Sequence, residues 1–490
     1  MNEQPPNDSG GPWDGVLAIL ADGARPDVMA QLAAAGEMPA LKRHFVDRGG
    51  FRTATGVFPT VSGPAHLPLL TGLHPGQANL PGIRWAERPT TARGGFLFRT
   101  RSYMSLGRAR KLERDLAPSV TTLFHHLPGT ADVNTWFVRG CRRSARMTRY
   151  SKAASFVRSF VTTDWYASDL QAERAVARAW DRGFSSAFAV FPAIDELGHR
   201  FGPTTPESLE AYRRFDKCLG RVIDDLARRG RADRTLIVIT SDHGQTATHT
   251  HLDIDDLVRV VYPRTLCYPK LWRHLFNAEA AAMVSGNGMA NLYVQGPAGW
   301  HQRPDFDDER SRAGELRARL IAHVGIEHVI YRRDPTTFVI AGRTGRLVVR
   351  VEDGGGAEPT LRLAVEGDAD PLGYPALPAA MRKSEVAALT AATRFPDAPS
   401  QLVDFFRASR AGDLIVCARS GFDLRSRYEY QPHLGSHGCL DREHMLVPAA
   451  VNARWTRDDV HAIDLFPTML TALGVPTPPG RFGHAIPLEP

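Results

Sequence analysis

Three short apolar runs constrain most strongly what this 490-residue chain can fold into. The runs are VLAILA at 16–21, AFAVFP at 187–192 and TLIVIT at 235–240. Their apolar residues do not alternate with polar ones, which is typical of strands that are buried on both faces of a parallel sheet. Helical stretches separate the runs, as at 206–229, where apolar residues recur on one helical face. We therefore predict an α/β fold built on a mostly parallel sheet.

Metal-ligating residue types lie at or just beyond the carboxyl ends of these three runs. Asp22 follows the first run, Asp195 follows the second, and Asp242 and His243 follow the third. Sheets of this kind bind ligands at the carboxyl ends of their strands. His199 lies four residues after Asp195, so both side chains share one face of a helical turn and could bind one divalent ion.

A further histidine, His437, lies in the segment GSHGCL between Gly435 and Gly438. A loop containing these glycines could bring His437 close to the other candidate ligands. Taken singly, each of these signals has an ordinary structural interpretation: a turn after a strand, a solvated helix face or a loop. Their joint order and their positions at strand ends favour a metal site with only nitrogen and oxygen donors.

The composition places the chain among ordinary folded proteins, with 43% hydrophobic and 23% charged residues. The net charge of +7 suits an anionic substrate or surface but is also common in Arg-rich proteins, and we expect no specific binding of nucleic acid. Residues 1–13 resemble a disordered lead-in rather than a signal peptide. No apolar stretch approaches the roughly 18 residues of a transmembrane helix. The five cysteines lack paired spacing, so we expect a cytoplasmic protein; the sequence does not indicate an oligomeric state.

The composition of the sequence and its pattern of predicted strands and helices change twice along the chain. We predict a catalytic core formed by residues 14–248 and 411–490, interrupted by an inserted cap at 249–410. Within the insertion, 342–368 reads as a hairpin with a Gly-rich turn. The core is expected to resume with DLIVCARSG at 413–421 and to end with a helix near 464–473.

Five segments resemble the alkaline phosphatase superfamily, in particular its type I phosphodiesterase / nucleotide pyrophosphatase branch. They are LADGARPD, VFPTVSGPAHLPLLTGLHPG, IDELGHRFGP, ITSDHGQ and GSHG, and they occur in the order found in that family. The resemblance implies a three-layer, alkaline-phosphatase-like core with a mostly parallel central sheet and an inserted α+β cap.

The resemblance also implies two bound divalent ions, with zinc favoured and manganese or iron as alternatives. One ion would be held by Asp22, Asp242 and His243, and the other by Asp195, His199 and His437. The implied nucleophile is Ser62, which would contact the first ion, and Thr60 is the less favoured candidate. The segment GPAHLPLLTG after Ser62 predicts a helix whose first backbone amides could bind phosphate oxygens.

The function implied is metal-dependent hydrolysis of a phosphodiester or pyrophosphate through a covalent phosphoseryl intermediate. The substrate would be a small phosphoester, such as a nucleotide, a phospholipid head group or a sugar phosphate. The alternatives are a phosphomonoesterase or phosphonate hydrolase of the same superfamily, and less favoured ones are a sulfatase or a noncatalytic binding protein. The sulfatase motif requires Arg where this chain has His66, for which we expect an ordinary loop role or a role behind the ligands.

The chain departs from the family after the nucleophile. Diesterases of this branch usually carry an Asn in the segment that here reads NLPGIRW, with Ile83 near the expected position. Arg84 could bind a phosphoryl group and Trp85 could stack on a base or cover a lipid chain, so both are candidate substrate-binding residues. A surface Arg and a core Trp are the alternatives. Asn287 is expected in a turn, with a position facing the site as the second possibility.

Overall fold

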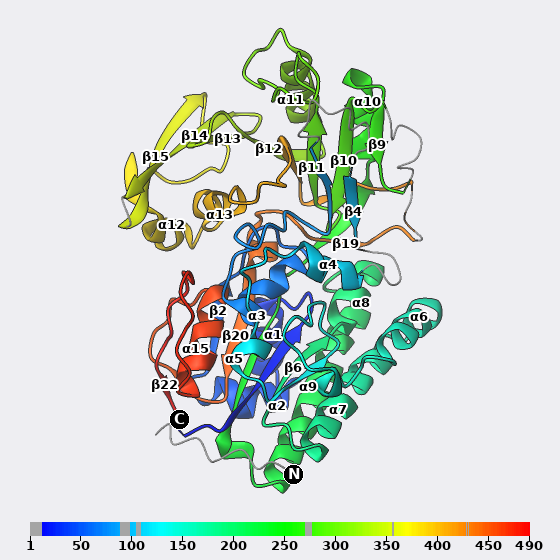
Figure 1. Ribbon diagram of the computed structural model, residues 1–490, viewed down its shortest axis with the longest axis vertical. Coiled ribbons are helices and arrows are strands. Elements are labelled where there is room, and N and C mark those ends of the chain that lie inside the picture. Colours follow the sequence, from blue (N-terminus) through cyan, green and yellow to red (C-terminus); the bar gives the residue numbers. More distant parts are fainter. Residues whose placement is uncertain are drawn as a thin grey trace.

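The structure is a computed structural model that describes residues 12–88, 99–103, 109–269, 277–354, 357–427, 429 and 431–490. Except for its last two residues, the predicted lead-in at 1–13 lies outside these ranges. The described residues build two sheets that follow one another along the long axis of the molecule (Figure 1). The first and last parts of the chain form the lower sheet, and the middle part forms most of the upper one.

The lower sheet has six strands in the order β2-β20-β7-β1-β6-β5. Its strands are β1 (Gly15–Ala21), β2 (Phe51–Thr55), β5 (Thr130–Val133), β6 (Ser186–Phe191), β7 (Thr235–Thr240) and β20 (Leu446–Val451). Strands β7, β1, β6 and β5 are parallel, whereas β20 runs antiparallel to both β7 and β2. The three apolar runs are therefore adjacent strands, β7-β1-β6, and all their residues are buried. Their carboxyl ends meet at one edge of the sheet.

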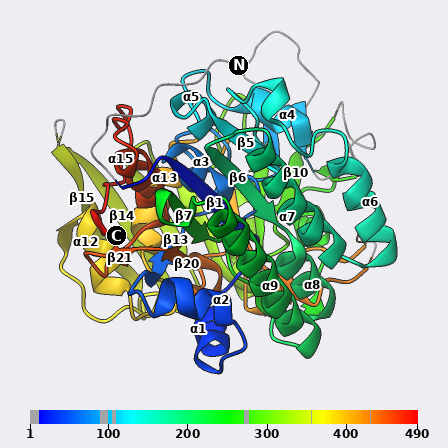
Figure 2. The ribbon, with the colours of Figure 1, turned by 90° about the horizontal axis from the view of Figure 1, so that it is seen from below.

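Helices cover both faces of this sheet, as the alternate residues of β1 show. Leu17 and Ile19 pack with α1 (Pro26–Ala34), α7 (Tyr166–Asp181) and α9 (Pro206–Arg228). Val16 and Ala18 pack on the opposite face with α3 (Leu67–Thr71) and α15 (Leu465–Ala472). Figure 2 shows α7 and α9 on one side of the sheet and α15 on the other. The predicted three-layer α/β core is confirmed, and the helices expected at 206–229 and near 464–473 are present as α9 and α15.

The upper sheet has nine strands in the order β16-β15-β14-β13-β12-β17-β11-β10-β9. Neighbouring strands are antiparallel except for β9 and β10. The strands are β9 (Thr265–Cys267), β10 (Ala280–Ser285), β11 (Met289–Val294), β12 (Ile326–Arg332), β13 (Thr337–Ala341), β14 (Gly345–Gly354), β15 (Ala357–Gly367), β16 (Ala380–Arg382) and β17 (Leu414–Ala418). The accompanying helices are α10 (Ile254–Val261), α11 (Arg312–Ala322), α12 (Lys383–Thr390) and α13 (Ala398–Phe405). The hairpin expected at 342–368 is the pair β14 and β15.

One prediction about the upper sheet is wrong. The segment at 413–421 does not return to the six-stranded sheet, because β17 pairs with β11 and β12 inside the nine-stranded sheet. The six-stranded sheet resumes only with β20. All five residues of β17 are buried, and an unalternating apolar run of this kind fits a central strand of either sheet. The run therefore could not indicate which sheet it joins.

A three-stranded sheet lies between the two larger ones and consists of β8 (Thr246–His251), β18 (Gly421–Asp423) and β19 (Gly435–Ser436). It carries the chain from the end of β7 towards the upper sheet and brings the segment after β19 back to the same edge (Figure 1). The remaining elements are α2 (Pro39–Leu41), α4 (Ala109–Asp115), α5 (Leu123–His126), α6 (Lys152–Thr162), α8 (Ala193–Phe201), α14 (Arg442–Met445), β3 (Arg84–Glu87), β4 (Arg99–Ser102), β21 (Arg454–Trp455) and β22 (Leu488–Glu489). Within the described ranges, no helix is both long enough and apolar enough to cross a membrane.

Candidate metal centre

Seven residues predicted from the sequence converge at the carboxyl edge of the six-stranded sheet. They come from the ends of β1 and β7, from α8, from the loop after β2 and from the residue after β19. They are Asp22, Ser62, Asp195, His199, Asp242, His243 and His437. Among the six candidate ligands other than Ser62, all but His199 are fully buried. The candidate residues at the strand ends therefore lie together at one edge of the sheet.

The first group of donors surrounds the imidazole of His243. Its Nε2 lies 3.3 Å from Oδ2 of Asp242 and 3.9 Å from Oδ1 of Asp22. The hydroxyl oxygen of Ser62 lies 3.1 Å from the same nitrogen and 3.4 Å from Oδ1 of Asp22. One serine hydroxyl thus shares a small volume with two carboxylates and an imidazole.

The second group lies beside the first. Nε2 of His199 is 3.5 Å from Oδ2 of Asp195 and 3.2 Å from Nε2 of His437. These three residues offer ligand atoms that all lie within 4.8 Å of one another. The rings of His437 and His243 stack with their centroids 3.6 Å apart, so the two groups are continuous.

The three imidazoles are oriented by backbone carbonyl groups. Nδ1 of His199 lies 2.7 Å from the carbonyl oxygen of Gly435, and Nδ1 of His437 lies 2.7 Å from that of Thr60. Nδ1 of His243 lies 3.1 Å from the carbonyl oxygen of Gly244. A carbonyl oxygen can only accept, so each Nδ1 carries the proton and each Nε2 keeps a lone pair directed into the site. This arrangement is the usual one for histidine ligands of metals.

The electrostatics of the site fit bound cations. Burial, together with the negative charges of Asp242 and Asp195, raises the pKa of Asp22 well above its ordinary value. Burial and the neighbouring His243 and His199 hold the pKa of His437 well below the ordinary value for histidine. Oδ2 of Asp242 is buried and has no hydrogen-bond partner among the described residues. Divalent ions would satisfy this oxygen and relieve the repulsion between the carboxylates, so the donor set fits metal ions.

The structure places His66 directly beside two of the candidate ligands. Its ring is 1% exposed, and its Nε2 lies 3.3 Å from Oδ2 of Asp242 and 4.0 Å from Oδ2 of Asp22. Neither ring nitrogen has a hydrogen-bond partner within the described part of the chain. Asp22, His66 and Asp242 together could hold an ion, so His66 is a further candidate ligand rather than an ordinary loop residue. The only signal was its place in the Ser62 segment, which does not reveal that His66 faces two carboxylates.

Gln245 also contributes to the site without having been predicted. Its side-chain amide donates to Oδ1 of Asp195 and, at 3.0 Å, to the carbonyl oxygen of the same residue. Gln245 is 1% exposed, and Gly198 packs so closely against it that a Cβ there would lie 2.0 Å from its Oε1. The amide therefore fixes the orientation of Asp195.

We expect Gln245→Leu to weaken metal binding at the Asp195 group by about 10- to 100-fold, because loss of a group that orients a ligand typically has an effect of this size. Competition with a chromogenic chelator would measure the change. Gln401→Leu is a matched control, because Gln401 is equally buried but bonds to Asp397 and to the backbone at Gly56 and Phe58. Metal affinity in Gln245→Leu equal to that of the control would contradict a role in orienting Asp195.

The two candidate nucleophiles have different surroundings. The Thr60 hydroxyl donates to the carbonyl oxygen of Cys439 at 2.8 Å and accepts from the amide of Gly438 at 3.1 Å. Thr60 is fully buried and so serves to hold the loop that contains His437. Ser62 faces the carboxylates and His243, as described above. The helix expected after Ser62 is divided into a 3-10 turn (Pro64–His66) and α3. The amides of Ala65 and His66 donate to the carbonyl oxygens of Val61 and Gly63, which precede the turn.

The two candidate substrate-binding residues also differ. Trp85 is fully buried beside Tyr103 in the core, with ring centroids 5.2 Å apart, so it cannot stack on a base as it lies. Trp85 is therefore a core tryptophan, which was the alternative interpretation. Arg84 is 4% exposed and lines a pocket beside the site, and Ile83 is 5% exposed. Asn287 is buried in a turn with φ of 62°, and its side chain bonds to Asp423 and His433.

The start of α8, which carries Asp195 and His199, is held by a buried carboxyl group on α7. Oδ1 of Asp169 accepts from the amide of Ala193 at 3.2 Å, whereas its Oδ2 has no hydrogen-bond partner among the described residues. Burial raises the pKa of Asp169 from 3.8 to about 8. Because the folded-state pKa exceeds the unfolded value, this carboxyl contributes stability that is fully present below pH 3.8 and is lost as the pH rises through about 8.

Asp169→Asn is therefore expected to flatten the fall of unfolding free energy with rising pH, by about 1.4 kcal/mol for each pH unit between the two pKa values. Asn keeps an oxygen for the Ala193 amide and cannot ionise. Urea denaturation at a series of pH values would measure the difference. Asp233→Asn is the control, because it removes a carboxylate from an exposed position. Parallel pH profiles for the wild type and Asp169→Asn would contradict the expectation.

Comparisons with known proteins agree with the fold. The family model for "Type I phosphodiesterase / nucleotide pyrophosphatase" matches residues 16–358, which is more than half of the chain. A solved structure of phosphonoacetate hydrolase from Sinorhizobium meliloti 1021, in complex with phosphonoformate, covers 94% of this chain and 96% of its own. It aligns with a TM-score of 0.56 at 17% identity, which is a likeness of fold alone.

Curated relatives match over shorter stretches. Human ectonucleotide pyrophosphatase/phosphodiesterase family member 7 is 44% identical over 56 residues, covering 11% of this chain and 12% of the relative. GPI ethanolamine phosphate transferase 1 of Gibberella zeae is 24% identical over 273 residues, covering 51% of this chain and 25% of the relative. The matched parts thus span a quarter or less of these relatives' length.

The fold places the chain among α/β proteins that share the architecture of the phosphonoacetate hydrolase structure. More narrowly, the chain belongs to the type I phosphodiesterase / nucleotide pyrophosphatase family. The family membership predicted from the five sequence segments is confirmed.

Proposed function

We propose that this protein hydrolyses phosphodiester or pyrophosphate bonds by transferring the phosphoryl group to Ser62 and then to water. The observation that carries the proposal is the position of the Ser62 hydroxyl, 3.1 Å from Nε2 of His243 and 3.4 Å from Oδ1 of Asp22, inside a buried donor set. A serine hydroxyl is a weak nucleophile at neutral pH unless its surroundings favour loss of the proton. The Ser62 position is the one in the described site where a bound cation would supply that effect.

Two divalent ions would be held by the two donor groups. Asp22, Asp242 and His243 would hold one ion, with His66 as an additional donor, and Asp195, His199 and His437 would hold the other. The donors are carboxylate oxygens and imidazole nitrogens, a set that suits zinc and also accepts manganese or iron. When bound, such ions supply Lewis-acid stabilisation of the oxygens that gain negative charge during phosphoryl transfer.

The residues of the chain itself would perform the remaining tasks. The Ser62 hydroxyl attacks phosphorus, the bond from phosphorus to the leaving oxygen breaks, and the leaving oxygen takes up a proton. Water then attacks the phosphoseryl group, the bond to Oγ breaks, and Ser62 is restored. The carbonyl groups of Gly435, Thr60 and Gly244 keep the three imidazoles fixed throughout, so the site needs little rearrangement during the reaction.

The class of substrate and the location of the protein belong to the same proposal. We take the substrate to be a small phosphoester, with a nucleotide, a phospholipid head group or a sugar phosphate as the leading classes. A phosphonate is the second candidate, supported by the likeness of fold to a phosphonoacetate hydrolase. A cytoplasmic location is supported by the five cysteines, which are all free and buried, as suits a reducing compartment.

The proposal is tested by comparing two chromogenic esters with zinc-loaded protein. We expect bis-p-nitrophenyl phosphate to be cleaved with a higher kcat/KM than p-nitrophenyl phosphate, by about tenfold or more, since the family is one of diesterases. Phosphonoacetate is the third arm, with release of inorganic phosphate as the readout. A preference for the monoester or for phosphonoacetate would overturn the diesterase assignment, and no cleavage of any of the three would overturn the hydrolase itself.

A further inference from the structure

Arg84 is a buried guanidinium whose charge is not neutralised. It is 4% exposed at the start of β3, and its NH1 donates to the carbonyl oxygen of Val284 at 2.9 Å. Its Nε has no hydrogen-bond partner among the described residues, and the negative charges of Glu429 and Asp423 act on it through space. A buried charge without a partner is costly, so proteins normally pair it or use it to bind a ligand of opposite charge.

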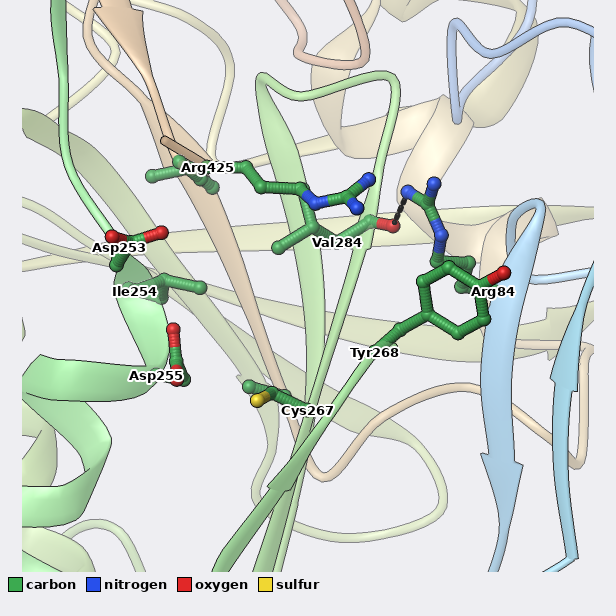
Figure 3. Close-up of a pocket in the computed structure, with 10 residues that line it drawn as sticks. Arg84, Asp253, Ile254, Asp255, Cys267, Tyr268, Val284 and Arg425 are labelled. Atoms are coloured by element: carbon green, nitrogen blue, oxygen red, sulfur yellow. Dashed lines mark hydrogen bonds between the residues drawn. The ribbon is translucent and has the colours of Figure 1, made fainter. Parts of the chain in front are cut away.

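A second arginine adds to this positive charge. Arg425 points towards Arg84, and the two guanidinium groups approach one another on either side of the Val284 carbonyl (Figure 3). Burial and then the charge of Arg425 lower the pKa of Arg84 to about 9. Arg425 forms an ion pair with Glu429 at 2.9 Å. That carboxylate therefore partners Arg425 rather than Arg84.

The other acidic groups of the pocket are already engaged. Asp255 pairs with Arg259 at 2.5 Å. Oδ1 of Asp253 accepts from the backbone amides of Ser426 and Arg427, each at 3.0 Å. Figure 3 shows both aspartates on the side of the pocket away from Arg84. They therefore leave the Arg84 side of the pocket positive.

The size of the pocket limits what it can hold. The space open to the centre of a water molecule is about 20 Å³, slightly more than one water requires. The Tyr268 ring closes one side, with its centroid 5.1 Å from the Arg84 guanidinium and 5.8 Å from that of Arg425. A nucleobase or a lipid chain does not fit such a space, whereas one oxygen edge of a carboxylate or phosphate does.

The pocket adjoins the metal centre on the side of His199 and His437. Ser285, whose Oγ accepts from the Arg84 amide at 3.3 Å, is followed by Gly286, whose carbonyl accepts from the His437 amide at 3.1 Å. Glu429, the ion-pair partner of Arg425, lies 3.7 Å from Nε2 of His433, and the His433 ring is tilted against that of His199 with centroids 4.5 Å apart. Ser62 lies with the other donor group. In an in-line displacement the leaving oxygen departs opposite the nucleophile, so a leaving group directed past His199 and His437 would reach the pocket.

We propose that Arg84 and Arg425 form a subsite for a second anionic group, a carboxylate or a phosphate, on the leaving part of the substrate. This inference rests on the proposed function and narrows it, because the preferred substrate then carries a negative charge beyond the bond that is cleaved. Two guanidinium groups at one small opening bind planar anionic oxygens by several parallel hydrogen bonds. The free charge of Arg84 is neutralised only when such a substrate is bound.

The experiment compares two esters that differ by one carboxylate, ethyl 4-nitrophenyl phosphate and ethyl 3-carboxy-4-nitrophenyl phosphate, with zinc-loaded protein. We expect the wild type to prefer the carboxylated ester in kcat/KM. Arg84→Met and Arg425→Met are each expected to lower this preference by about 10- to 100-fold, the range for loss of a charged hydrogen bond. Arg427→Gln is the matched control: it removes one positive charge from an exposed position near the pocket and should leave the preference unchanged.

Thermal unfolding separates binding from folding. Because Arg84→Met removes a buried unpaired charge, its melting temperature without substrate is expected to equal or exceed that of the wild type. Arg425→Met provides an independent measurement should Arg84→Met fail to fold. Equal preference for the two esters in the wild type, or a preference that survives both substitutions, would overturn the subsite, while cleavage of the ester without the carboxylate upholds the proposed function. Failure to cleave either ester would overturn both.

Discussion

Replacing Ser62 with alanine is expected to lower kcat by at least about 1000-fold, or about 4 kcal/mol of transition-state stabilisation. The substitution removes the only hydroxyl that lies between His243 and Asp22 in the described site, at 3.1 Å and 3.4 Å from their ligand atoms. The six carboxylate and imidazole donors stay in place, so metal content should be unchanged. Initial rates with bis-p-nitrophenyl phosphate and metal analysis of the same samples would measure both quantities.

Two further variants give this prediction its controls. Ser62→Thr keeps a hydroxyl at the same position and should retain activity, because a threonine can act as the same kind of nucleophile. Thr60→Val removes the other hydroxyl of the segment, which bonds to Cys439 and Gly438, and should act through the stability of the His437 loop. A Ser62→Ala protein that contains its metals and turns over at the wild-type rate would refute the covalent mechanism.

The position of the metal centre could be predicted because it depends on local pattern. Asp22 and Asp242 follow apolar runs that are too uniform for half-exposed strands, and parallel strands bring such ends together whatever their order in the sheet. The spacing of Asp195 and His199 needs only one helical turn, which α8 supplies. These features are encoded within a few residues of sequence, so no long-range contact had to be known.

Other parts of the site depend on contacts between distant segments. His66 lies in the quoted Ser62 segment and Gln245 lies in ITSDHGQ, yet their roles arise from Asp242 and from Asp195, which is 50 residues away from Gln245. Trp85 has an indole ring of the kind that can stack on a base, but it packs against Tyr103 in the core. Residue type and spacing do not determine burial of this kind.

Strand β17 illustrates the same limit at the level of the fold. Its five residues satisfy the pattern of a buried strand, and its neighbours β11 and β12 precede it by many residues in the chain. Only pairing with those neighbours assigns it to the nine-stranded sheet. The charge of Arg84 was likewise visible in the sequence, whereas the lack of a hydrogen-bond partner for its Nε among the described residues is a property of the folded chain.

Asp242→Asn is expected to remove one of the two proposed ions and to lower kcat by at least about 1000-fold. Oδ1 of Asp242 accepts from the amides of Gly23 and His243 at 3.3 Å and 3.1 Å, and an asparagine oxygen can do the same. Its unpartnered Oδ2 would be replaced by an amide nitrogen, which cannot bind a cation. Metal analysis should then find about one ion per chain where the wild type holds two.

Asp216→Asn is the matched control for Asp242→Asn, because Asp216 is as buried but accepts only from the backbone amides of Ala40 and Leu41. It changes the same atoms at a distance from the donors, so its metal content and activity should equal those of the wild type. Two ions in Asp242→Asn would show that Oδ2 is not a ligand. One ion with full activity would show that the ion at the Asp22 group is not needed to activate Ser62. The roles proposed for the two ions would then have to be exchanged.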